Sequence, residues 1–420
     1  MQSKKIALLV MALTLLTATS LQAGNNVLVG YWDTYAGPGD YTAALAPYAN
    51  VSYIALGADT ADVPKAITEA SNYGMKSIVS VQGVFFQNQG NSPNLINGWG
   101  TNWSNFAQSI SAQVAANDVA AFYLYDEPDG AGVSIQALSA EANAVRTAFP
   151  SVPLMIIYQP GNYLGLSLVD WAGIDCYSNG QWTCANGQSY SAAYSGLRSR
   201  LNSNQRTVLV PQAGYQSNSL CCNAALEQEL QAYVALSIGD PDVVAIIPFI
   251  WPNATGFQGL SSYNSGAGSL GAYYTAVSSA FKNGYAYPFS TSTPAYEFYA
   301  PGTNNHFVTT SVLEGLSNGF NLQGIAWNVL PMQASGTMPL YRCHISAGNR
   351  HFSSTSSSCE GQIVEGVYGY IYSYQAANTS PLVRYYDPYD GDFYDSVATV
   401  TPPNYQRVGV LGYVPNVGVP

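Results

Sequence analysis

The sequence predicts two domains, a (β/α)8 TIM barrel over residues 24–284 and an all-β domain of three repeats over residues 294–420. In the first, short runs rich in Val, Ile and Tyr alternate with helical patterns. The runs are apolar throughout, as expected of parallel strands covered on both faces. Eight strand–helix units in about 260 residues match the size of a closed barrel. A doubly wound sheet is the alternative, but no G-x-G-x-x-G motif follows the first run.

The predicted elements alternate along the chain. Strands are expected at 27–33, 51–57, 77–84, 119–126, 153–158, 171–177, 206–212 and 243–251. Helices are expected between them at 63–73, 103–116, 133–149, 190–201 and 224–237, with weaker ones at 40–48 and 163–169 and a last one at 271–282.

The first 23 residues have the form of a secretory signal. Lys4 and Lys5 precede an apolar run at 6–16, and Ala23 is the small residue at the expected cleavage point. This run is too short to span a bilayer, which takes about 20 residues. We therefore expect an exported protein, extracellular or periplasmic, that does not insert into a membrane.

The exported chain is acidic. Removing Lys4 and Lys5 from the 13 basic residues leaves 11 against 24 acidic ones, a net charge of −13. Nucleic acid and anionic membranes need a basic patch, so neither is expected as a partner. Only 9% of residues are charged, with 33 Tyr and 39 Gly, which fits a protein that handles neutral, hydroxyl-rich ligands and equally a merely protease-resistant surface. We expect a monomer that binds a polysaccharide or cell-surface glycan, without a metal or other cofactor.

All six cysteines lie in the exported chain, which fits an oxidising compartment. Cys343 and Cys359 stand apart in the C-terminal third and are expected to pair. Adjacent cysteines rarely bridge one another, so we expect loop-to-loop pairing, with the individual partners left open, among Cys176, Cys184, Cys221 and Cys222. A zinc site made from these four is the alternative.

Histidine chemistry is excluded from the barrel. The chain has three histidines, His306, His344 and His351, and all lie in the repeat domain. The barrel therefore cannot hold a Ser-His-Asp or Cys-His arrangement, nor a histidine-based metal site. Its general acid and base must be carboxylates or tyrosines.

Glu127 is the candidate proton donor. Active sites of such barrels lie at the carboxyl ends of the strands, and Glu127 is the one barrel glutamate at such a position. A carboxyl group ringed by Tyr123 and Tyr125 loses hydration, which raises its pKa and keeps a proton for a glycosidic oxygen. The alternative is that Glu127 only caps the next helix or pairs with an arginine. The other barrel glutamates fall inside predicted helices, where we expect them to face solvent: Glu69, Glu141, Glu227 and Glu229.

A second carboxylate and a saccharide cleft are expected at the other strand ends. Asp175 or Asp33 could be the base of an inverting pair, whose carboxyl groups stand about 6.5–9.5 Å apart, against about 5 Å in retaining enzymes. A saccharide cleft uses aromatic faces for sugar rings, and amides or phenols for hydroxyls. Each candidate taken alone could also be a packing residue at the end of the barrel. The candidates are Asp126, Tyr31, Trp32, Gln82, Tyr158, Gln159, Tyr177, Gln212, Tyr215 and Trp251.

The barrel resembles glycoside hydrolases of two kinds. The segment Y-D-E-P at 125–128 resembles the N-E-P segment of cellulase-type retaining enzymes, whose Glu is the acid/base and whose preceding residue holds a sugar hydroxyl. G-Y-W at 30–32 and S-V-Q-G at 80–83 resemble chitinase-type barrels, whose strand-four Glu is the acid and whose strand-eight Trp, here Trp251, floors the cleft. Both resemblances imply that Glu127 is the proton donor.

The sequence also departs from both kinds. Cellulase-type enzymes place a nucleophilic Glu where this chain has Gln212, and chitinase-type enzymes place aspartates where it has Tyr125 and Tyr123. Neither double displacement nor substrate-assisted chemistry is therefore supported. The leading hypothesis is a secreted glycosidase acting on a polysaccharide. A non-catalytic glycan-binding protein or adhesin is the rival, and a peptidoglycan hydrolase is a third possibility.

Residues 285–293 have the composition of a linker, and three corresponding units follow it. Phe307, Phe352 and Phe393 mark spacings of 45 and 41 residues. Such units could close as a trefoil-like barrel or form an incomplete propeller. They resemble a family of uncharacterised bacterial repeats with a G-D-H-F-Y-T-T-like signature, and Asp392 replaces the histidine in the third unit. The domain could bind glycans or a cell surface, while its histidines could simply hold a turn in each repeat.

Overall fold

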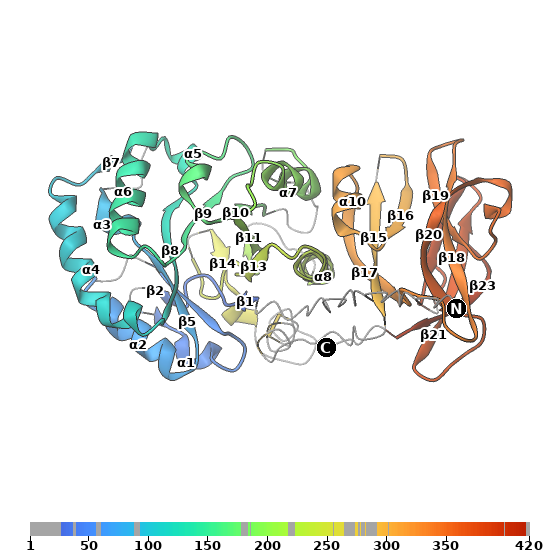
Figure 1. The fold of residues 1–420 in the computed structure, drawn as a ribbon, viewed down its shortest axis with the longest axis horizontal. Coiled ribbons are helices and arrows are strands. Elements are labelled where there is room, and N and C mark those ends of the chain that lie inside the picture. The colour runs from blue at the N-terminus through green and yellow to red at the C-terminus, as the bar shows by residue number, and fades with distance from the viewer. Residues whose placement is uncertain are drawn as a thin grey trace, which may run out of the picture.

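The computed structural model describes residues 27–36, 39–55, 60–87, 93–177, 184, 186–216, 223–254, 256–263, 274–275, 278, 282, 292–300, 302–398 and 400–416. An α/β barrel and an all-β domain lie side by side along its long axis (Figure 1). The expected secretory signal, Cys221, Cys222 and most of the expected last barrel helix and linker lie outside the described residues.

The N-terminal body is the expected barrel. Its parallel strands follow one another in the order β1 (Leu28–Val29), β13 (Val243–Ile246), β11 (Arg206–Val210), β10 (Trp171–Asp175), β9 (Leu154–Tyr158), β8 (Val119–Asp126), β5 (Lys76–Ser80) and β4 (Val51–Ile54). The sheet closes where the Asn50 amide donates to the Val29 carbonyl (2.9 Å) and where β2 (Tyr35–Ala36) pairs with β4. A short strand β3 (Gly39–Asp40) pairs with β2.

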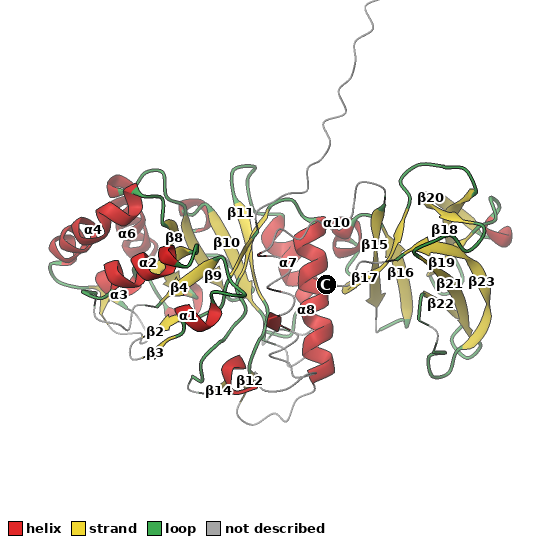
Figure 2. Cartoon of the chain, turned by 90° about the horizontal axis from the view of Figure 1, so that it is seen from below, coloured by secondary structure: helices red, strands yellow, loops and turns green. Residues whose placement is uncertain are grey.

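Helices cover the outside of the barrel (Figure 2). The longer ones are α2 (Val63–Asn72), α4 (Trp99–Ala115), α6 (Ile135–Ala148), α7 (Tyr190–Arg198) and α8 (Asn223–Gly239). Shorter helical turns are α1 (Thr42–Leu45), α3 (Gln82–Phe85), α5 (Pro128–Ala131), η1 (Leu166–Leu168) and η2 (Leu260–Tyr263). A small hairpin pairs β6 (Phe86–Gln87) with β7 (Asn94–Leu95), and β12 (Tyr215–Gln216) pairs antiparallel with β14 (Phe257–Gln258), which follows β13.

Two helical glutamates contradict the expectation that they face solvent. Glu141 on α6 is 0% exposed and Glu229 on α8 is 2% exposed. Both oxygens of Glu141 lack a hydrogen-bond partner among the described groups, and burial raises the pKa of this carboxyl well above its ordinary value. Glu141 is therefore held as a neutral acid behind β8.

Each unit of the all-β domain contributes three antiparallel strands in the same register. The elements of the domain are β15 (Thr293–Ala300), β16 (Asn305–Thr309), α10 (Val312–Ser317) and β17 (Asn321–Val329), then β18 (Thr337–Ile345), β19 (Arg350–Ser354), η3 (Cys359–Gly361) and β20 (Ile363–Tyr372), and finally β21 (Thr379–Asp387), β22 (Asp392–Ser396) and β23 (Gln406–Pro415). The first unit forms its own sheet, and the second and third join into one six-stranded sheet where β20 pairs with β23. The register shifts at two equivalent points in each unit. The second strand of each unit in chain order is β16, β19 or β22. These three strands contact one another, so the units surround a common axis.

The disulfides agree with one expectation and correct another. Cys343 and Cys359 pair, with Cα atoms 5.5 Å apart, as expected. Cys176 pairs with Cys184 (Cα atoms 4.6 Å apart), so the expected pairing between loops is wrong for these two residues. Both cysteines belong to the single connection between β10 and α7. Within the described residues, no helix is long and apolar enough to cross a membrane.

The barrel and the first repeat unit share one apolar core. Helix α8 packs along β17, and α10 contacts α7 and α8 (Figure 2). A single buried cluster contains Leu236 from the barrel together with Val312 and Leu316 from the repeat unit. At Gly239 the packing is so close that an added Cβ would lie 2.6 Å from Cγ1 of Val312.

We expect Gly239→Ala to lower the free energy of unfolding by about 1–3 kcal/mol, because the added methyl group overpacks this junction. The matched control is Gly100→Ala on α4, where nothing lies within 4 Å of the added Cβ. That change should be neutral or stabilising by up to about 1 kcal/mol, since Ala favours helix. Urea unfolding measures the free energy of unfolding of both variants. Equal changes in the two would contradict close packing between Gly239 and Val312.

Candidate active site

Two carboxyl residues at the barrel mouth, meaning the carboxyl ends of the parallel strands, have unusual backbone conformations. Glu127 directly follows β8 with φ +47°, and Asp33 follows β1 with φ +56°. Left-handed backbone at a non-glycine residue costs about 1–3 kcal/mol and persists where the surroundings enforce it, often at functional sites. Two features hold the backbone of Glu127 in this conformation. The Glu127 amide donates to the Ile157 carbonyl (3.0 Å), and Pro128 begins α5 directly after it.

Glu127 and Asp175 form a close carboxyl pair. Asp175 is the last residue of β10, and its carboxyl lies within hydrogen-bonding reach of the Glu127 carboxyl. Burial, then the charges of Asp126 and Glu127, raise the pKa of Asp175 well above its ordinary value. Burial and Asp126 also raise the pKa of Glu127. The contact between the two carboxyl groups raises the pKa of Asp175 and lowers that of Glu127, so Asp175 is the less acidic member of the pair.

Hydrogen bonds fix the orientation of the pair and of its neighbour Asp126. Nε2 of Gln159 donates to Oε2 of Glu127 (2.6 Å), and the Tyr123 hydroxyl donates to Oδ1 of Asp126 (2.5 Å). Oε1 of Gln82 accepts from the Asp126 amide (3.2 Å). The Asp126 side chain is open to solvent at its edge, yet the surrounding protein removes enough hydration to raise its pKa.

Asp33 is the fourth carboxyl group at the mouth. Burial, and then the charge of Asp126, raise the pKa of Asp33 to about 6. It is therefore mostly ionised near pH 7, whereas the pKa of Asp175 is raised well above its ordinary value. The mouth thus combines carboxyl groups of different acidity, as acid/base cleavage requires.

Aromatic rings surround these carboxyl groups. Trp32 stacks on Tyr53 (centroids 4.1 Å apart), and Tyr123 meets both rings edge-on. On another side of the mouth, Tyr177 stacks on Phe249 (5.0 Å), and Phe257 packs edge-on against both. Asp126, Trp32, Gln82 and Tyr177, together with Gln159, are therefore the expected binding residues that the structure brings to the mouth.

Tyr31 and Trp251 do not lie at the mouth, contrary to expectation. Tyr31 is 0% exposed and Trp251 3% exposed, and their rings pack edge to face with centroids 5.2 Å apart. The Tyr31 hydroxyl bonds to Ser278 (2.7 Å), and both rings belong to a buried cluster that includes Leu226 and Leu230 of α8. Trp32 belongs to a different buried cluster, which contains strand residues such as Tyr123 and Met155, so the two neighbouring side chains point to different sides of the barrel wall.

Tyr158 and Gln212 are also packing residues rather than binding residues. Tyr158 is 0% exposed and lies edge-on to Tyr163 (5.5 Å), so Gln159 takes the position at the mouth. Gln212 is 0% exposed, and its Nε2 donates to the Gly214 carbonyl (2.9 Å). The side chain of Tyr215 lies outside the described residues. The aromatic residues at 53, 249 and 257 were not expected at the mouth, although positions 53 and 249 fall within predicted strand runs.

Comparison with known proteins gives a family for part of the chain. Residues 273–365 match a domain of unknown function (DUF5648), which spans the linker, the first repeat unit and part of the second. No curated protein matches the chain.

Several solved structures are similar to the chain at low identity. One is the virulence factor SghA from Agrobacterium tumefaciens (11% identity, TM-score 0.38, covering 58% of this chain and 85% of that one). Another is a glycoside hydrolase family 5 enzyme from Prevotella bryantii B14 (14% identity, TM-score 0.39, 62% and 97%). A third is a beta-glucuronidase from Bacteroides uniformis (11% identity, TM-score 0.38, 54% and 30%). Identity and TM-score are too low for any activity or residue role to be transferred from them.

Proposed function

We propose that this protein is a secreted glycoside hydrolase that cleaves a polysaccharide by carboxylate acid/base catalysis. The observation that carries the proposal is the close Glu127–Asp175 carboxyl pair, with both pKa values raised, at the same end of the barrel as Asp33, whose pKa is about 6. Cleaving a glycosidic bond takes one carboxylic acid to protonate the leaving oxygen and one carboxylate on the other side of the sugar. The mouth supplies both, in a barrel that has no histidine.

Each carboxyl group has a distinct role in this proposal. Glu127 donates the proton, and Gln159 holds one of its oxygens in place. Asp33 is the second carboxylate, because Asp175 lies too close to Glu127 to leave room for a water or sugar between them. Asp175 instead keeps the proton on the pair. Asp126, Trp32, Gln82 and Tyr177 position the sugar, with the tyrosine and tryptophan rings as stacking surfaces.

The repeat domain is proposed to bind a glycan or a cell surface. Tyr374 and Tyr389 are 55% and 88% exposed, and exposed tyrosines can stack on sugar rings. The histidines have structural contacts instead: Nδ1 of His306 lies 2.7 Å from Oδ2 of Asp392, which joins the first unit to the third.

The experiment that tests the function is a hydrolysis screen of the full-length exported protein. Bacterial, fungal and plant polysaccharides, peptidoglycan included, are incubated with the protein, and new reducing ends are measured. We expect release from at least one polymer. Tight binding to a glycan without turnover, unchanged in Glu127→Gln, would instead support the non-catalytic glycan-binding protein.

We expect the ionisation of Asp33 to control how kcat/KM changes with pH on the acidic side of the profile. Its raised pKa of about 6 means that the carboxylate forms as pH rises through this value, so kcat/KM should rise there. At higher pH, kcat/KM should fall as the Glu127–Asp175 pair loses its proton. Asp33→Asn should lower kcat/KM and remove the rise near pH 6, as measured on the polymer found by the screen. An unchanged acidic side in this variant would show that Asp33 is not the second carboxylate.

A further inference from the structure

We propose that the barrel mouth selects a sugar with a free primary amine, as in a de-N-acetylated amino-sugar polymer, over neutral and acidic sugars. The inference rests on the proposed function of the mouth and adds the charge of its substrate. It follows from where the cations of the barrel lie, from the carboxyl groups at the mouth, and from one oxygen of Asp175.

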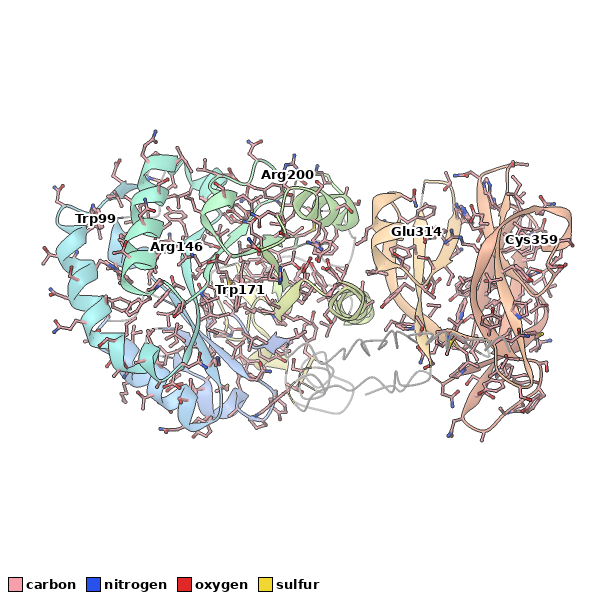
Figure 3. All side chains as sticks on the ribbon, viewed as in Figure 1. Trp99, Arg146, Trp171, Arg200, Glu314 and Cys359 are labelled. Atoms are coloured by element: carbon pink, nitrogen blue, oxygen red, sulfur yellow. A yellow bond between two sulfur atoms is a disulfide. The ribbon has the colours of Figure 1, made fainter. Side chains whose placement is uncertain are left out.

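None of the cations of the barrel region lies at the last residue of a strand, although Lys65 is in the first turn of α2, which follows β4. Two occupy the first residues of β5 and β11, which are the opposite ends of those strands, and the others lie on or beside helices; Figure 3 labels Arg146 on α6 and Arg200 just after α7. The full set is Lys65, Lys76, Arg146, Arg198, Arg200, Arg206 and Lys282. The undescribed segments between residues 37 and 273 contain no Lys, Arg or His in sequence either.

The carboxyl groups at the mouth have no compensating cation among the groups that act on their pKa values. Asp126 acts on the pKa of Asp33, Glu127 and Asp175, and the other causes are burial, a carboxyl neighbour, tyrosines and Gln159. An acidic sugar would meet like charge here, and a protonated amine would meet opposite charge in a partly dehydrated site.

One carboxyl oxygen at the mouth lacks a donor. Oδ1 of Asp175 is buried and has no hydrogen-bond partner in the part of the chain that the structure describes. A protonated amine has three donors and suits such an oxygen. The Tyr177 ring beside it, stacked on Phe249, adds an aromatic face of the kind that attracts cations.

Binding to an inactive full-length variant tests the inference separately from catalysis. Glu127→Gln is titrated calorimetrically near pH 6 with the β-1,4 tetrasaccharide of glucosamine, its fully N-acetylated counterpart and tetragalacturonate. We expect the glucosamine tetramer to bind tighter than either by about tenfold or more, and its advantage to shrink at high salt. Its binding should also release protons, seen as a heat that depends on the buffer, because a bound cation lowers the pKa of neighbouring carboxyl groups.

A second pair of variants identifies the carboxylate responsible. Asp175→Asn, added to Glu127→Gln, should bring the affinity for the glucosamine tetramer down to that for the N-acetylated one. Asp118→Asn removes the same charge just before β8, at the opposite end of the barrel, and should keep the preference. Equal or tighter binding of the N-acetylated or acidic tetramer, or no binding of any tetramer, would overturn the inference. Glu127-dependent hydrolysis of a neutral polymer would leave the proposed function standing.

Discussion

Replacing Glu127 by glutamine is expected to lower kcat on the cleaved polysaccharide by about 10²–10⁴-fold, with little change in KM. The amide cannot give up a proton to the leaving oxygen, which is the step assigned to this carboxyl. It keeps the size of the side chain and an oxygen that can accept from Gln159, so the sugar should still bind. Steady-state kinetics of both proteins on the same polymer measure the effect.

The matched control for this variant is Glu69→Gln. Glu69 lies on α2, away from the strand ends, and undergoes the same chemical change. Its kcat should equal that of the unmodified protein. If Glu127→Gln were as active as Glu69→Gln, the proton donor would have to be another group.

The largest stability effect is expected in the repeat domain, at Arg384. Its guanidinium stacks over Phe352 (5.0 Å) and bonds to Glu360 (2.8 Å) and to the Ser353 carbonyl. It also lies 3.6 Å from the buried carboxyl of Asp395, whose pKa it lowers against the effect of burial. Arg384→Met should lower the free energy of unfolding by about 3–5 kcal/mol, because Asp395 would remain buried without its cation.

Arg146→Met is the control for the Arg384 variant. Arg146 forms an ion pair with Asp170 (3.1 Å), but their side chains are 41% and 37% exposed. Losing this pair should cost about 0–1 kcal/mol. Denaturant unfolding of the full-length variants gives both values. Similar losses at the two sites would contradict the buried network around Arg384.

The barrel could be predicted from the sequence because its strands are apolar throughout. All five residues of β9 are buried, and such runs between amphipathic helices are typical of a parallel sheet that is covered on both faces. The same property hides which side chains point inward. Because polar and apolar residues do not alternate, the sequence does not show which residue of a neighbouring pair faces the mouth. Of Tyr31 and Trp32, and of Tyr158 and Gln159, only the second reaches the mouth.

Of three further features, the burial of Glu141 was predictable from the sequence, whereas the Cys176–Cys184 pairing and the Glu127–Asp175 contact depend on tertiary structure. Burial of Glu141 could have been predicted, since Leu138 and Val145 lie three and four residues away on the same buried face of α6. The pairing of Cys176 with Cys184 depends on how one loop folds back, which spacing alone does not determine. The contact between Glu127 and Asp175 joins the ends of β8 and β10, and its closeness depends on the tilt of strands that are not neighbours.

The central claim, that the mouth hydrolyses a glycosidic bond, is tested most directly by the fate of water oxygen. The polymer found by the screen is digested in heavy-oxygen water by the unmodified protein, and its products are analysed by mass spectrometry. We predict one heavy oxygen at each new reducing end, and formation of labelled product that is slower in Glu127→Gln by about 10²–10⁴-fold. Products without the label, or labelled products formed equally by Glu127→Gln, would contradict the claim.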